Sequence, residues 1–403
     1  TIVRNGFGPA MGGTYTIGTS TGKDFRTITL AEAAMFQRGI CSPVVFNIQQ
    51  GTYTEQVKFR KYIGVSSTNN IRFRPDPSNT TQVNWTFAST STSDGSRGTA
   101  IFDGAQYISV DSINIINTGT STGVVVEMVN GPSFLSFTGD SLLYKGGSTS
   151  TTSNINVVRN FRQGGNDMTF KHNVLVGGGY SVYNYGNSTS DPVLNWTFEN
   201  NKLLDWNYSG AYFSNNKGCE FNWNELRNRD GAYGYFGARL EYCYESNINY
   251  NTINMSSTGY AYTYYLRYNR ALSSARKSIS NNIATITGGN GTHFGMRLDY
   301  CDYNDIDFNS ISIEKGNAYP VYLYFGNGVN FRNNVIASWG ANYRYYQSGS
   351  QTSSNNVWWA PNATRATGTL GSNVLNVDPK FTSLTDLHSS STALHNTGVS
   401  TGI

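Results

Sequence analysis

The sequence predicts an all-β protein whose chain winds into a parallel β-helix, a solenoid of short strands. Three observations lead to this fold class. A short pattern centred on asparagine recurs along the chain, strand-like segments precede it at a fixed interval, and Gly, Ser, Thr, Asn and Tyr are abundant. The chain has 14% aromatic residues and 43 Gly but only 9 Pro, a composition typical of many short strands joined by turns.

The asparagine pattern reads apolar, any, any, Asn, any, apolar, and it recurs about every 22 to 33 residues, the period of a solenoid coil. If the coils stack in register, each Asn amide can donate a hydrogen bond to the next, which satisfies buried polar groups. Asn also tolerates the left-handed backbone of a tight turn. We therefore predict a structural ladder of stacked side chains formed by Asn173, Asn201, Asn224, Asn251, Asn282, Asn309 and Asn334.

Three degenerate copies extend the repeat. A weaker copy ends at Asn356, and two earlier copies carry Asp instead of Asn, at Asp111 and Asp140. The repeat thus predicts three regions: an N-terminal cap with the first strands over 1–60, β-helix coils over 61–372, and a C-terminal capping segment over 373–403. Caps are expected because an exposed terminal coil is an unpaired sheet edge.

The front cap is predicted to contain a helix. Residues 29–32 (TLAE) form a capping box, and Gly39 is a helix stop. The helix between them would turn Leu30, Ala33 and Ala34 toward the first coil. Flanking segments at 14–18 and 44–48 are predicted as the first strands.

A second register accompanies the asparagine pattern. Apolar residues precede the next ladder Asn by one shared interval, at Phe213, Leu240, Leu298 and Leu323, and Leu266 takes the same place before a longer turn. The strands around them alternate, so one set of side chains faces inward and the other outward. The outward set forms two columns: Tyr212, Arg239, Tyr265, Arg297 and Tyr322, and beside them Ser214, Glu241, Arg267, Asp299 and Tyr324.

Charge and hydropathy exclude several classes of protein. Charged residues make up 13% of the chain, the net charge is +4 and no Lys/Arg run is present, so we expect no nucleic-acid partner. No apolar stretch approaches the roughly 18 residues of a membrane span, and we expect none. We interpret Thr1 as the start of a trimmed mature chain without a signal peptide.

The four cysteines lack metal-ligand spacing, and no dense acidic cluster suggests a Ca²⁺ site. We therefore expect no metal and no cofactor. The cysteines are predicted to be buried, unpaired side chains. They are Cys41, Cys219, Cys243 and Cys301.

The asparagine ladder resembles that of the pectate-lyase-like right-handed parallel β-helix superfamily. The front segments 13–18, 24–28, 43–48 and 51–55 are similar to the N-terminal cap of secreted and surface-attached β-helix proteins of gliding-type bacteria. The tail segments 376–381, 386–388 and 392–394 resemble the closing motif of such domains. The resemblance implies a single-stranded right-handed solenoid of about twelve coils, secreted or displayed at the cell surface.

In this superfamily the outward strand face often carries a glycan groove, so the resemblance implies a ligand-binding face. Aromatic rings stack on sugars and arginines hold carboxylates or sulfates. The predicted ligand-binding residues are Tyr212, Arg239, Tyr265, Arg297, Tyr322 and Tyr324. A structural alternative is that Glu241, Arg267 and Asp299, which alternate in sign one coil apart, only pair with each other.

Catalytic candidates lie on the same face. Glu241 and Asp299 are two coils apart, about 9.6 Å, near the upper limit for an inverting glycosidase, roughly 6.5–9.5 Å. Arg267 between them would keep both ionised, whereas a general acid must hold its proton. A lyase could use the cations Arg239, Arg267, Arg297 and His293, with Tyr265 as a proton shuttle.

The sequence favours a secreted or cell-surface β-helix protein with a structural or adhesive role and no catalysis. Its partner is predicted to be a polysaccharide, a neighbouring surface protein or further copies of itself in a filament, bound through the outward columns. The alternative on the same face is a polysaccharide lyase or glycoside hydrolase. A further alternative is a phage tailspike-like trimer.

Overall fold

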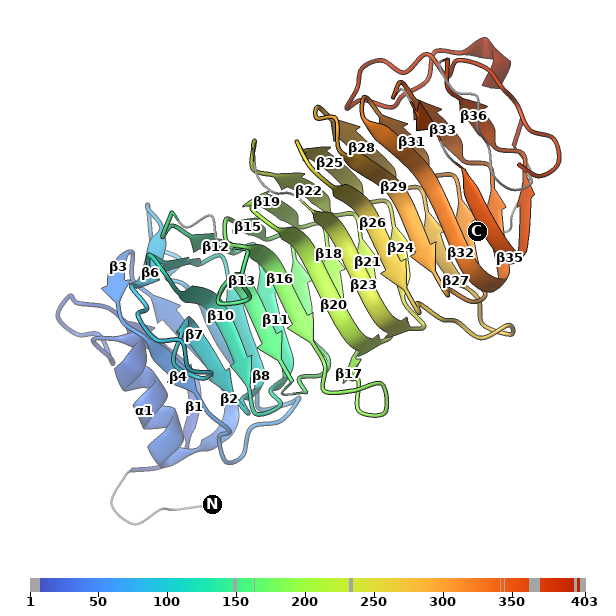
Figure 1. The fold of residues 1–403 in the computed structure, drawn as a ribbon. Coiled ribbons are helices and arrows are strands. Elements are labelled where there is room, and N and C mark those ends of the chain that lie inside the picture. The colour runs from blue at the N-terminus through green and yellow to red at the C-terminus, as the bar shows by residue number, and fades with distance from the viewer. Residues whose placement is uncertain are drawn as a thin grey trace. The chain divides into compact units, whose positions relative to one another are not determined.

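A computed structural model of the protein describes residues 8–147, 151–162, 164–231, 235–340, 342–343, 345–361, 370–394 and 397–398. The outer parts of the two predicted caps, 1–7 and 399–403, lie outside these residues. The chain divides into two compact units, residues 1–202 and 203–403. Each unit is a stack of parallel strands (Figure 1).

The first unit contains the helix α1 (Ile28–Arg38) and begins the strand series. Its strands are β1 (Met11–Ile17), β2 (Ile40–Ile48), β3 (Gly51–Thr54), β4 (Val57–Phe59), β5 (Ile71–Pro75), β6 (Val83–Phe87), β7 (Gly98–Asp103), β8 (Gln106–Asp111), β9 (Asn114–Asn117), β10 (Gly123–Val129), β11 (Ser133–Thr138), β12 (Ser141–Tyr144), β13 (Ile155–Phe161), β14 (Thr169–Lys171), β15 (Val174–Val176), β16 (Tyr180–Tyr185), β17 (Val193–Leu194) and β18 (Thr197–Glu199). The unit boundary falls within β19 (Lys202–Trp206).

The second unit continues with strands that repeat in the same order. They are β20 (Ser209–Lys217), β21 (Glu220–Asn222), β22 (Glu225–Asn228), β23 (Phe236–Tyr244), β24 (Asn247–Asn249), β25 (Thr252–Ser256), β26 (Ala261–Arg267), β27 (Lys277–Ser280), β28 (Ile283–Thr287), β29 (Thr292–Asp299), β30 (Asn304–Asp307), β31 (Ser310–Ile313), β32 (Asn317–Arg332), β33 (Val335–Ser338), β34 (Asn342–Tyr343), β35 (Tyr346–Ser354) and β36 (Val357–Trp359), followed by the short 3-10 helix η1 (Thr392–Leu394).

In both units, strands pair in parallel with the equivalent strands of neighbouring coils. In the second unit β20, β23, β26, β29 and β32 form one stack, and β21, β24, β27 and β30 form a second that continues the same sheet. The third stack is a separate sheet of β22, β25, β28, β31, β33 and β36. The predicted fold class is confirmed: the chain is nearly all β, with about twelve coils in the two units together.

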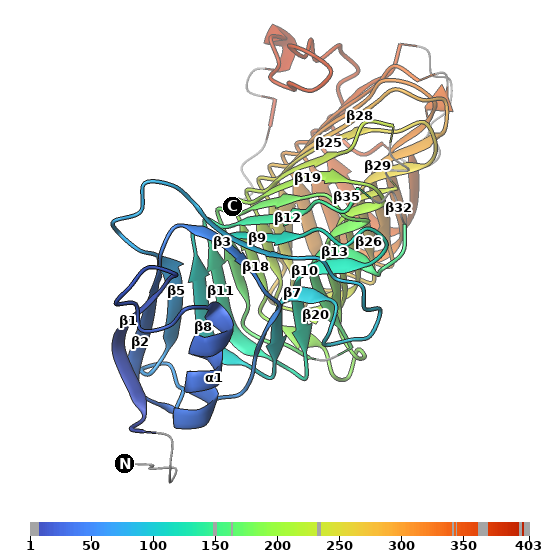
Figure 2. The ribbon, with the colours of Figure 1, turned by 90° about the vertical axis from the view of Figure 1, so that its left-hand side faces the viewer.

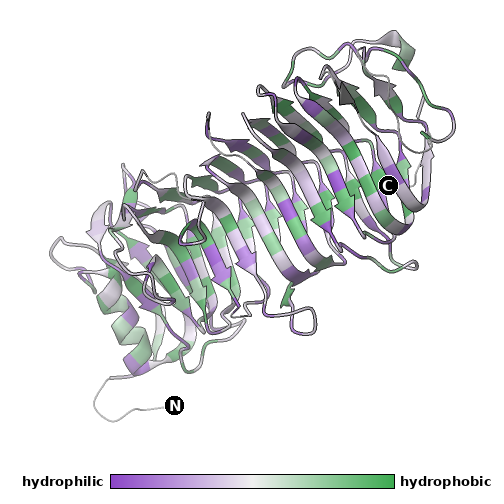
Figure 3. Ribbon diagram, viewed as in Figure 1, coloured by the Kyte–Doolittle hydropathy of each residue, from purple (hydrophilic) through white to green (hydrophobic). Residues whose placement is uncertain are grey.

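The interior of each unit is built from columns of like side chains. In the second unit Phe213, Leu240, Leu266, Leu298 and Leu323 pair in register, and all are buried. In the first unit buried rings stack across coils, with centroids 4.8 Å apart for Phe137 and Phe170 and 4.6 Å apart for Phe170 and Phe198. Figure 3 shows the resulting alternation of hydrophobic and hydrophilic bands along the strands.

A ladder of buried Asn side chains runs along the turn before the separate sheet. Asn251 shows the pattern: its Oδ1 accepts from the backbone N–H of Asn224 at 2.9 Å and from Asn224 Nδ2 at 3.0 Å. Its own Nδ2 donates to the carbonyl of Phe221 at 2.7 Å and to Asn282 Oδ1 at 3.1 Å. Equivalent bonds join Asn282, Asn309, Asn334 and Asn356 in this unit, and Asn173 and Asn201 in the first.

Two details of the predicted turn are wrong. The left-handed residue is the one before each ladder Asn, with φ of 60° at Trp223, 59° at Tyr250 and 58° at Phe308, so the Asn serves for its amide and not for its backbone. Asp111 is not a ladder residue. Its coil presents Ile113 there, whose N–H donates to Asp140 Oδ1 at 2.8 Å, and Asp111 forms an ion pair with Arg72 instead.

The predicted helix exists, but it begins earlier and presents a different face. Its N-cap is Thr27, whose side chain accepts from the N–H of Leu30 at 3.1 Å, and Gly39 ends it with φ of 75°. Leu30 is half exposed, whereas Ile28, Ala31 and Met35 are buried. The predicted face was displaced because the capping box was placed two residues late. Helix α1 contacts β1 and β4 at the start of the first unit (Figure 1), and Figure 2 shows the same helix from another side.

Cys219, Cys243 and Cys301 are buried, as predicted, but Cys41 is exposed because it lies on the outer side of β2. Within the described part of the chain, no helix has the length and apolar character to cross a membrane.

Asp140 occupies a ladder position but satisfies fewer hydrogen bonds than an Asn would, so replacing it with Asn should stabilise the protein. Its Oδ2 is buried without a hydrogen-bond partner, and burial raises the pKa of the carboxyl group well above its ordinary value. By the register of β8 and β11, an Asn amide here would face the carbonyl of Val110. We expect Asp140→Asn to increase the free energy of unfolding at pH 7 by about 1–3 kcal/mol.

The raised pKa of Asp140 also predicts how the stability difference between the wild type and the variant changes with pH. Because the folded state keeps the Asp140 proton to a higher pH than the unfolded state, the wild type loses stability as pH rises above about 4 toward the folded-state pKa. Asp140→Asn should remove this loss, so its advantage should shrink at pH 4. Urea unfolding at both pH values measures this, with Asp191→Asn, on an exposed loop, as the control. An equal gain in both variants would contradict the assignment.

Candidate functional site

The candidate site is the outward face of β20, β23, β26, β29 and β32, which we call the Tyr/Arg face. The structure brings the two predicted columns into register across these strands. The first pairs Tyr212, Arg239, Tyr265, Arg297 and Tyr322, and the second pairs Ser214, Glu241, Arg267, Asp299 and Tyr324. Tyr346 of β35, absent from the prediction, extends the first column and stacks on Tyr322 at 4.6 Å.

Arg239 is held between aromatic rings and a carboxylate. Its guanidinium carbon lies 4.6 Å from the ring centroids of both Tyr212 and Phe236. Its Nη2 donates to Glu241 Oε1 at 3.1 Å, and the hydroxyl of Tyr212 donates to Glu241 Oε2 at 3.1 Å. Burial alone would lower the pKa of Arg239, but the Glu241 and Tyr212 side chains outweigh it and raise the pKa. The side chain is therefore a fixed cation.

Arg297 repeats this arrangement two coils later. Its Nε donates to both carboxylate oxygens of Asp299 at 3.1 Å, and its Nη2 lies 2.9 Å from Oδ2. Its guanidinium carbon lies 5.0 Å from the ring centroid of Tyr322 and 5.4 Å from that of Tyr265. Burial, assisted by the Asp299 carboxylate, raises the pKa of Tyr265 to about 12, so its hydroxyl stays protonated at neutral pH.

The charged groups therefore pair within a strand and not between coils. Glu241 and Asp299 each bind the arginine two residues earlier, and neither forms an ion pair with Arg267, so the predicted alternating pairing is wrong. Residues i and i+2 lie on the same face of a strand, which permits this pairing. Within the part of the chain that the structure describes, Arg267 has no ion pair, and its guanidinium lies 5.3 Å from the Tyr268 ring centroid. It is the unpaired cation of this face.

Two further aromatic rows flank these columns, and sequence reasoning missed both. Strict alternation would turn the first inward, but contacts such as that of Phe236 with Arg239 place it outward. This row stacks with centroids 4.6–5.0 Å apart and consists of Phe236, Tyr262, Phe294 and Tyr319. The second has left-handed backbones and consists of Tyr242, Tyr268, Tyr300 and Phe325. The available signal for the first row was an aromatic residue three positions before four of the five members of the first column, all except Tyr212.

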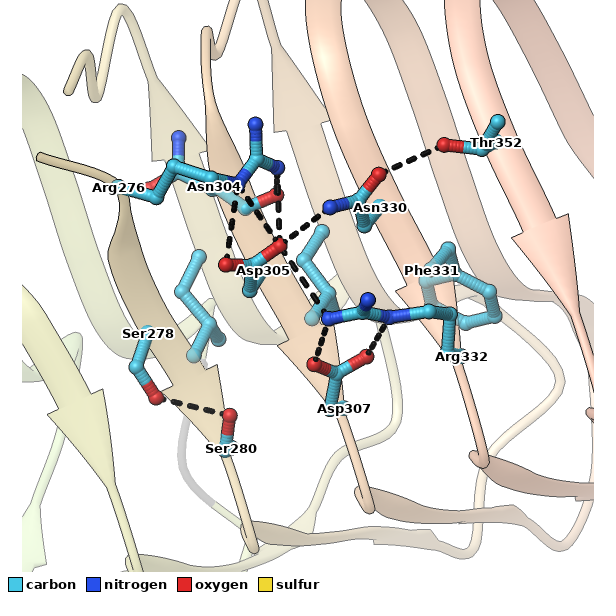
Figure 4. Close-up of polar contacts among 12 residues, drawn as sticks. Arg276, Ser278, Ser280, Asn304, Asp305, Asp307, Asn330, Phe331, Arg332 and Thr352 are labelled. Carbon is cyan, nitrogen blue, oxygen red and sulfur yellow. Dashed lines mark hydrogen bonds and ion pairs between the residues drawn. The ribbon is translucent and has the colours of Figure 1, made fainter. Parts of the chain in front are cut away.

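The neighbouring face of β27, β30, β32 and β35 carries a polar network (Figure 4). Arg276 Nε donates to both oxygens of Asp305 at 3.0 Å, and Arg332 donates to Asp307 at 3.0 and 2.6 Å. Asn330 Nδ2 donates to Asp305 Oδ1 at 2.6 Å. Burial raises the pKa of Asp307, although Arg332 opposes this. Because each carboxylate is paired with an arginine, we interpret this network as strand-fastening and not as a reactive site.

The first unit contains a buried charge cluster that the sequence analysis also missed. Glu127 is fully buried and lies 3.4 Å from Arg97 Nε and 3.6 Å from Arg159 Nη1. Asp94 accepts from both arginines, at 2.6 and 2.8 Å. The Glu127 carboxylate also accepts three backbone N–H bonds, from Gly95 and Arg97 in the loop before β7 and from Gly98, the first residue of β7. The cluster fastens this loop across β10 and β13. The sequence signal for this cluster was a single charged residue within each of two apolar strands, Glu127 in β10 and Arg159 in β13.

Among the described residues, no group of three or more His, Cys, Asp or Glu side chains is arranged to hold a metal ion. The carboxylates of the Tyr/Arg face are already bound by arginine, so they offer no ligand set. The chemistry available there is aromatic stacking, hydrogen bonding by tyrosine hydroxyls and one unpaired guanidinium.

No protein-family model matches the sequence, and no curated protein is similar to it. Among solved structures, the chain is similar to a GH136 lacto-N-biosidase from Eubacterium ramulus, with a TM-score of 0.51 and 9% identity over 90% of this chain and 68% of that one. It is also similar to the bacteriophage CBA120 tailspike protein 3 (TM-score 0.45, 12% identity, 90% and 61%) and to PfbA, a surface adhesin of Streptococcus pneumoniae (0.39, 12%, 81% and 87%).

At these identities the likeness concerns the fold alone. Together with the parallel coils, it supports the predicted parallel β-helix fold.

The two arginines Arg239 and Arg267 should differ sharply in their contribution to stability. Arg239→Ala would leave Glu241, whose side chain is 10% exposed, without its counter-ion. We expect it to lower the free energy of unfolding by about 2–4 kcal/mol. Arg267→Ala removes no ion pair and should cost less than about 1 kcal/mol. Urea unfolding of both variants measures the difference, and equal losses would contradict the pairing described above.

Proposed function

We propose that the protein is a secreted or cell-surface β-helix protein that binds a polysaccharide along the Tyr/Arg face and does not cleave it. The observation that carries this proposal is the repetition of aromatic and arginine side chains on one face, one per coil. Parallel coils are about 4.8 Å apart. A ligand that contacts several coils must therefore be extended, as a polysaccharide chain is.

The face is pre-organised for binding. Arg239 and Arg297 cannot reorient freely, because each is held by two or three rings and by one carboxylate. Rigid aromatic side chains lose little conformational entropy when a ligand stacks on them. Arg267 adds an unpaired guanidinium, which can hold a carboxylate or sulfate group on the polymer.

The same contacts argue against cleavage. A catalytic carboxyl group must be free to exchange a proton with the substrate, whereas a carboxylate in an ion pair already has its oxygens bonded to a cation. Glu241 and Asp299 are both in such pairs, and each also accepts a tyrosine hydroxyl. The proposal rests on this surface and not on the lacto-N-biosidase, because the similarity to that enzyme extends only to the fold. Secretion is inferred from the similarity of the front segment to the caps of secreted β-helix proteins.

Affinity electrophoresis in gels containing polygalacturonate, a sulfated galactan or neutral xyloglucan tests the proposal. We expect retardation by at least one polymer. Tyr265→Ala combined with Tyr322→Ala should weaken binding at least tenfold, because two rings of the central coils are lost, about 1–3 kcal/mol of stacking and burial each. Phe36→Ala, an exposed aromatic of α1, is the matched control and should bind normally.

Two results would overturn the proposal. One is turnover, seen as unsaturated products or new reducing ends and lost in Glu241→Gln or Arg267→Ala, which would make the face an active site. The other is self-association that depends on Tyr265 and Tyr322 in light-scattering measurements while no polymer binds, which would make the face a contact between copies of the chain.

A further inference from the structure

A second site lies at the turn that precedes the separate sheet of the second unit, away from the Tyr/Arg face. The residue before each ladder Asn has a left-handed backbone and points its side chain outward, one per coil. Along successive coils these residues are Trp223, Tyr250, Asn281 and Phe308, with φ between 57° and 60°. Backbone bonds from the N–H of Tyr250 to Ser280 and from the N–H of Asn281 to Asp307 keep these coils in register.

Three of these side chains are large, aromatic and exposed. The exposed fractions are 53% for Trp223, 41% for Tyr250 and 39% for Phe308. A left-handed backbone strains a bulky residue by about 1–3 kcal/mol, and Asn is the residue that tolerates it best, as Asn281 illustrates. Because the exposed rings gain little burial in return, their presence at strained positions points to a role in binding.

At the usual coil spacing, these rings leave a gap at Asn281, which we call the slot. Trp223 and Tyr250 stack on each other, with centroids 4.0 Å apart and planes 3° from parallel. The next ring, Phe308, is two coils beyond Tyr250, about 9.6 Å at the usual strand spacing. Only the short Asn281 side chain stands between them. Within the described residues its carboxamide makes no hydrogen bond, so its donors and acceptor are available to a ligand.

A hollow of about 450 Å³ opens beside Tyr250 and Asn281, and Phe308, one coil further on, lies outside its lining. The side chains of Trp223, Tyr250 and Asn281 form one wall, and those of Glu225, Thr252 and Ile283, the outward residues of β22, β25 and β28, form the other. A volume of this size is within the range of small-molecule sites, about 300–1,000 Å³. The hollow combines a ring face, an amide, a hydroxyl and a carboxylate.

We propose that this slot binds one pyranose ring of a saccharide, with Tyr250 and Phe308 against its two faces and the Asn281 carboxamide bonded to its hydroxyl groups. A ring placed midway lies about 4.8 Å from each aromatic, within the range at which rings pack. A flat nucleobase in contact with one wall, at about 3.5–4.0 Å, would stay more than about 5 Å from the other. The spacing therefore fits a puckered sugar and not a planar heterocycle.

Asn281→Tyr is the decisive variant. It would fill the slot by extending the Trp223–Tyr250 stack, and the backbone tolerates it because Tyr250 has the same left-handed conformation one coil away. The probes are the methyl glycosides of glucose, galactose and mannose, cellohexaose, laminarihexaose and mannohexaose, with adenosine as the planar competitor. Saturation-transfer NMR on the full chain, titrated with each probe, measures binding.

We expect at least one sugar to bind, with Kd raised at least tenfold in Asn281→Tyr and in Phe308→Ala but unchanged in the Tyr265→Ala, Tyr322→Ala double variant. Circular dichroism confirms that the variants fold. Three results overturn the site: no sugar binds the wild type, a sugar binds Asn281→Tyr as well as it binds the wild type, or adenosine binds in preference to every sugar. Loss of binding in the double variant alone would assign it to the Tyr/Arg face, so failure of this site and failure of the proposed function are distinguishable.

Discussion

A buried carboxamide that accepts two hydrogen bonds and donates two is the interaction on which the coils of each unit depend. Asn251 makes all four. Its Oδ1 accepts from the backbone N–H and from Nδ2 of Asn224, and its Nδ2 donates to the carbonyl of Phe221 and to Oδ1 of Asn282. A smaller side chain at this position would leave a backbone N–H and a carbonyl buried without partners. The ladder therefore fixes which residue of one coil lies above which residue of the next.

That register determines every outer surface. Since side chains alternate along a strand, a slip of one residue between coils would move the whole Tyr/Arg face into the interior. Arg239 meets the rings of Tyr212 and Phe236, and Arg297 meets those of Tyr265 and Tyr322, only because the strands cannot slip. The arrangement of the Tyr/Arg face is thus a consequence of hydrogen bonds made at a different part of each coil.

The sequence was sufficient for features that repeat. The ladder residues, the inward Leu column and the outward Tyr and Arg columns each recur at one interval, and the structure places them in register. Single events were harder to foresee. The helix start depends on Thr27 capping it, and the break in alternation beside Arg239 is marked in the sequence only by an aromatic residue three positions earlier. Asp111 matched the ladder pattern by its apolar neighbours, although the chain uses Ile113 there.

The sequence also could not predict which carboxylate of the Tyr/Arg face pairs with which arginine. Opposite charges lie one coil apart in the column Glu241, Arg267 and Asp299, and two residues apart within β23 and β29. Both separations permit contact, and the choice depends on how the rings of Tyr212, Tyr265 and Tyr322 orient the guanidinium groups. Cation–π geometry of this kind is a property of packed side chains, so a linear pattern does not contain it.

The separation of tasks at the turn has a consequence for how such a chain can diversify. The ladder Asn carries the structural duty, while the residue before it contributes only a backbone conformation and an outward side chain. Tryptophan, tyrosine, phenylalanine, asparagine and histidine all occupy this place within the described coils, at Trp223, Tyr250, Phe308, Asn281 and His172, with nearly the same dihedral angle. Substitutions of this residue leave the hydrogen bonds of the Asn ladder intact. The outer surface of each coil can therefore change independently while the fold stays the same.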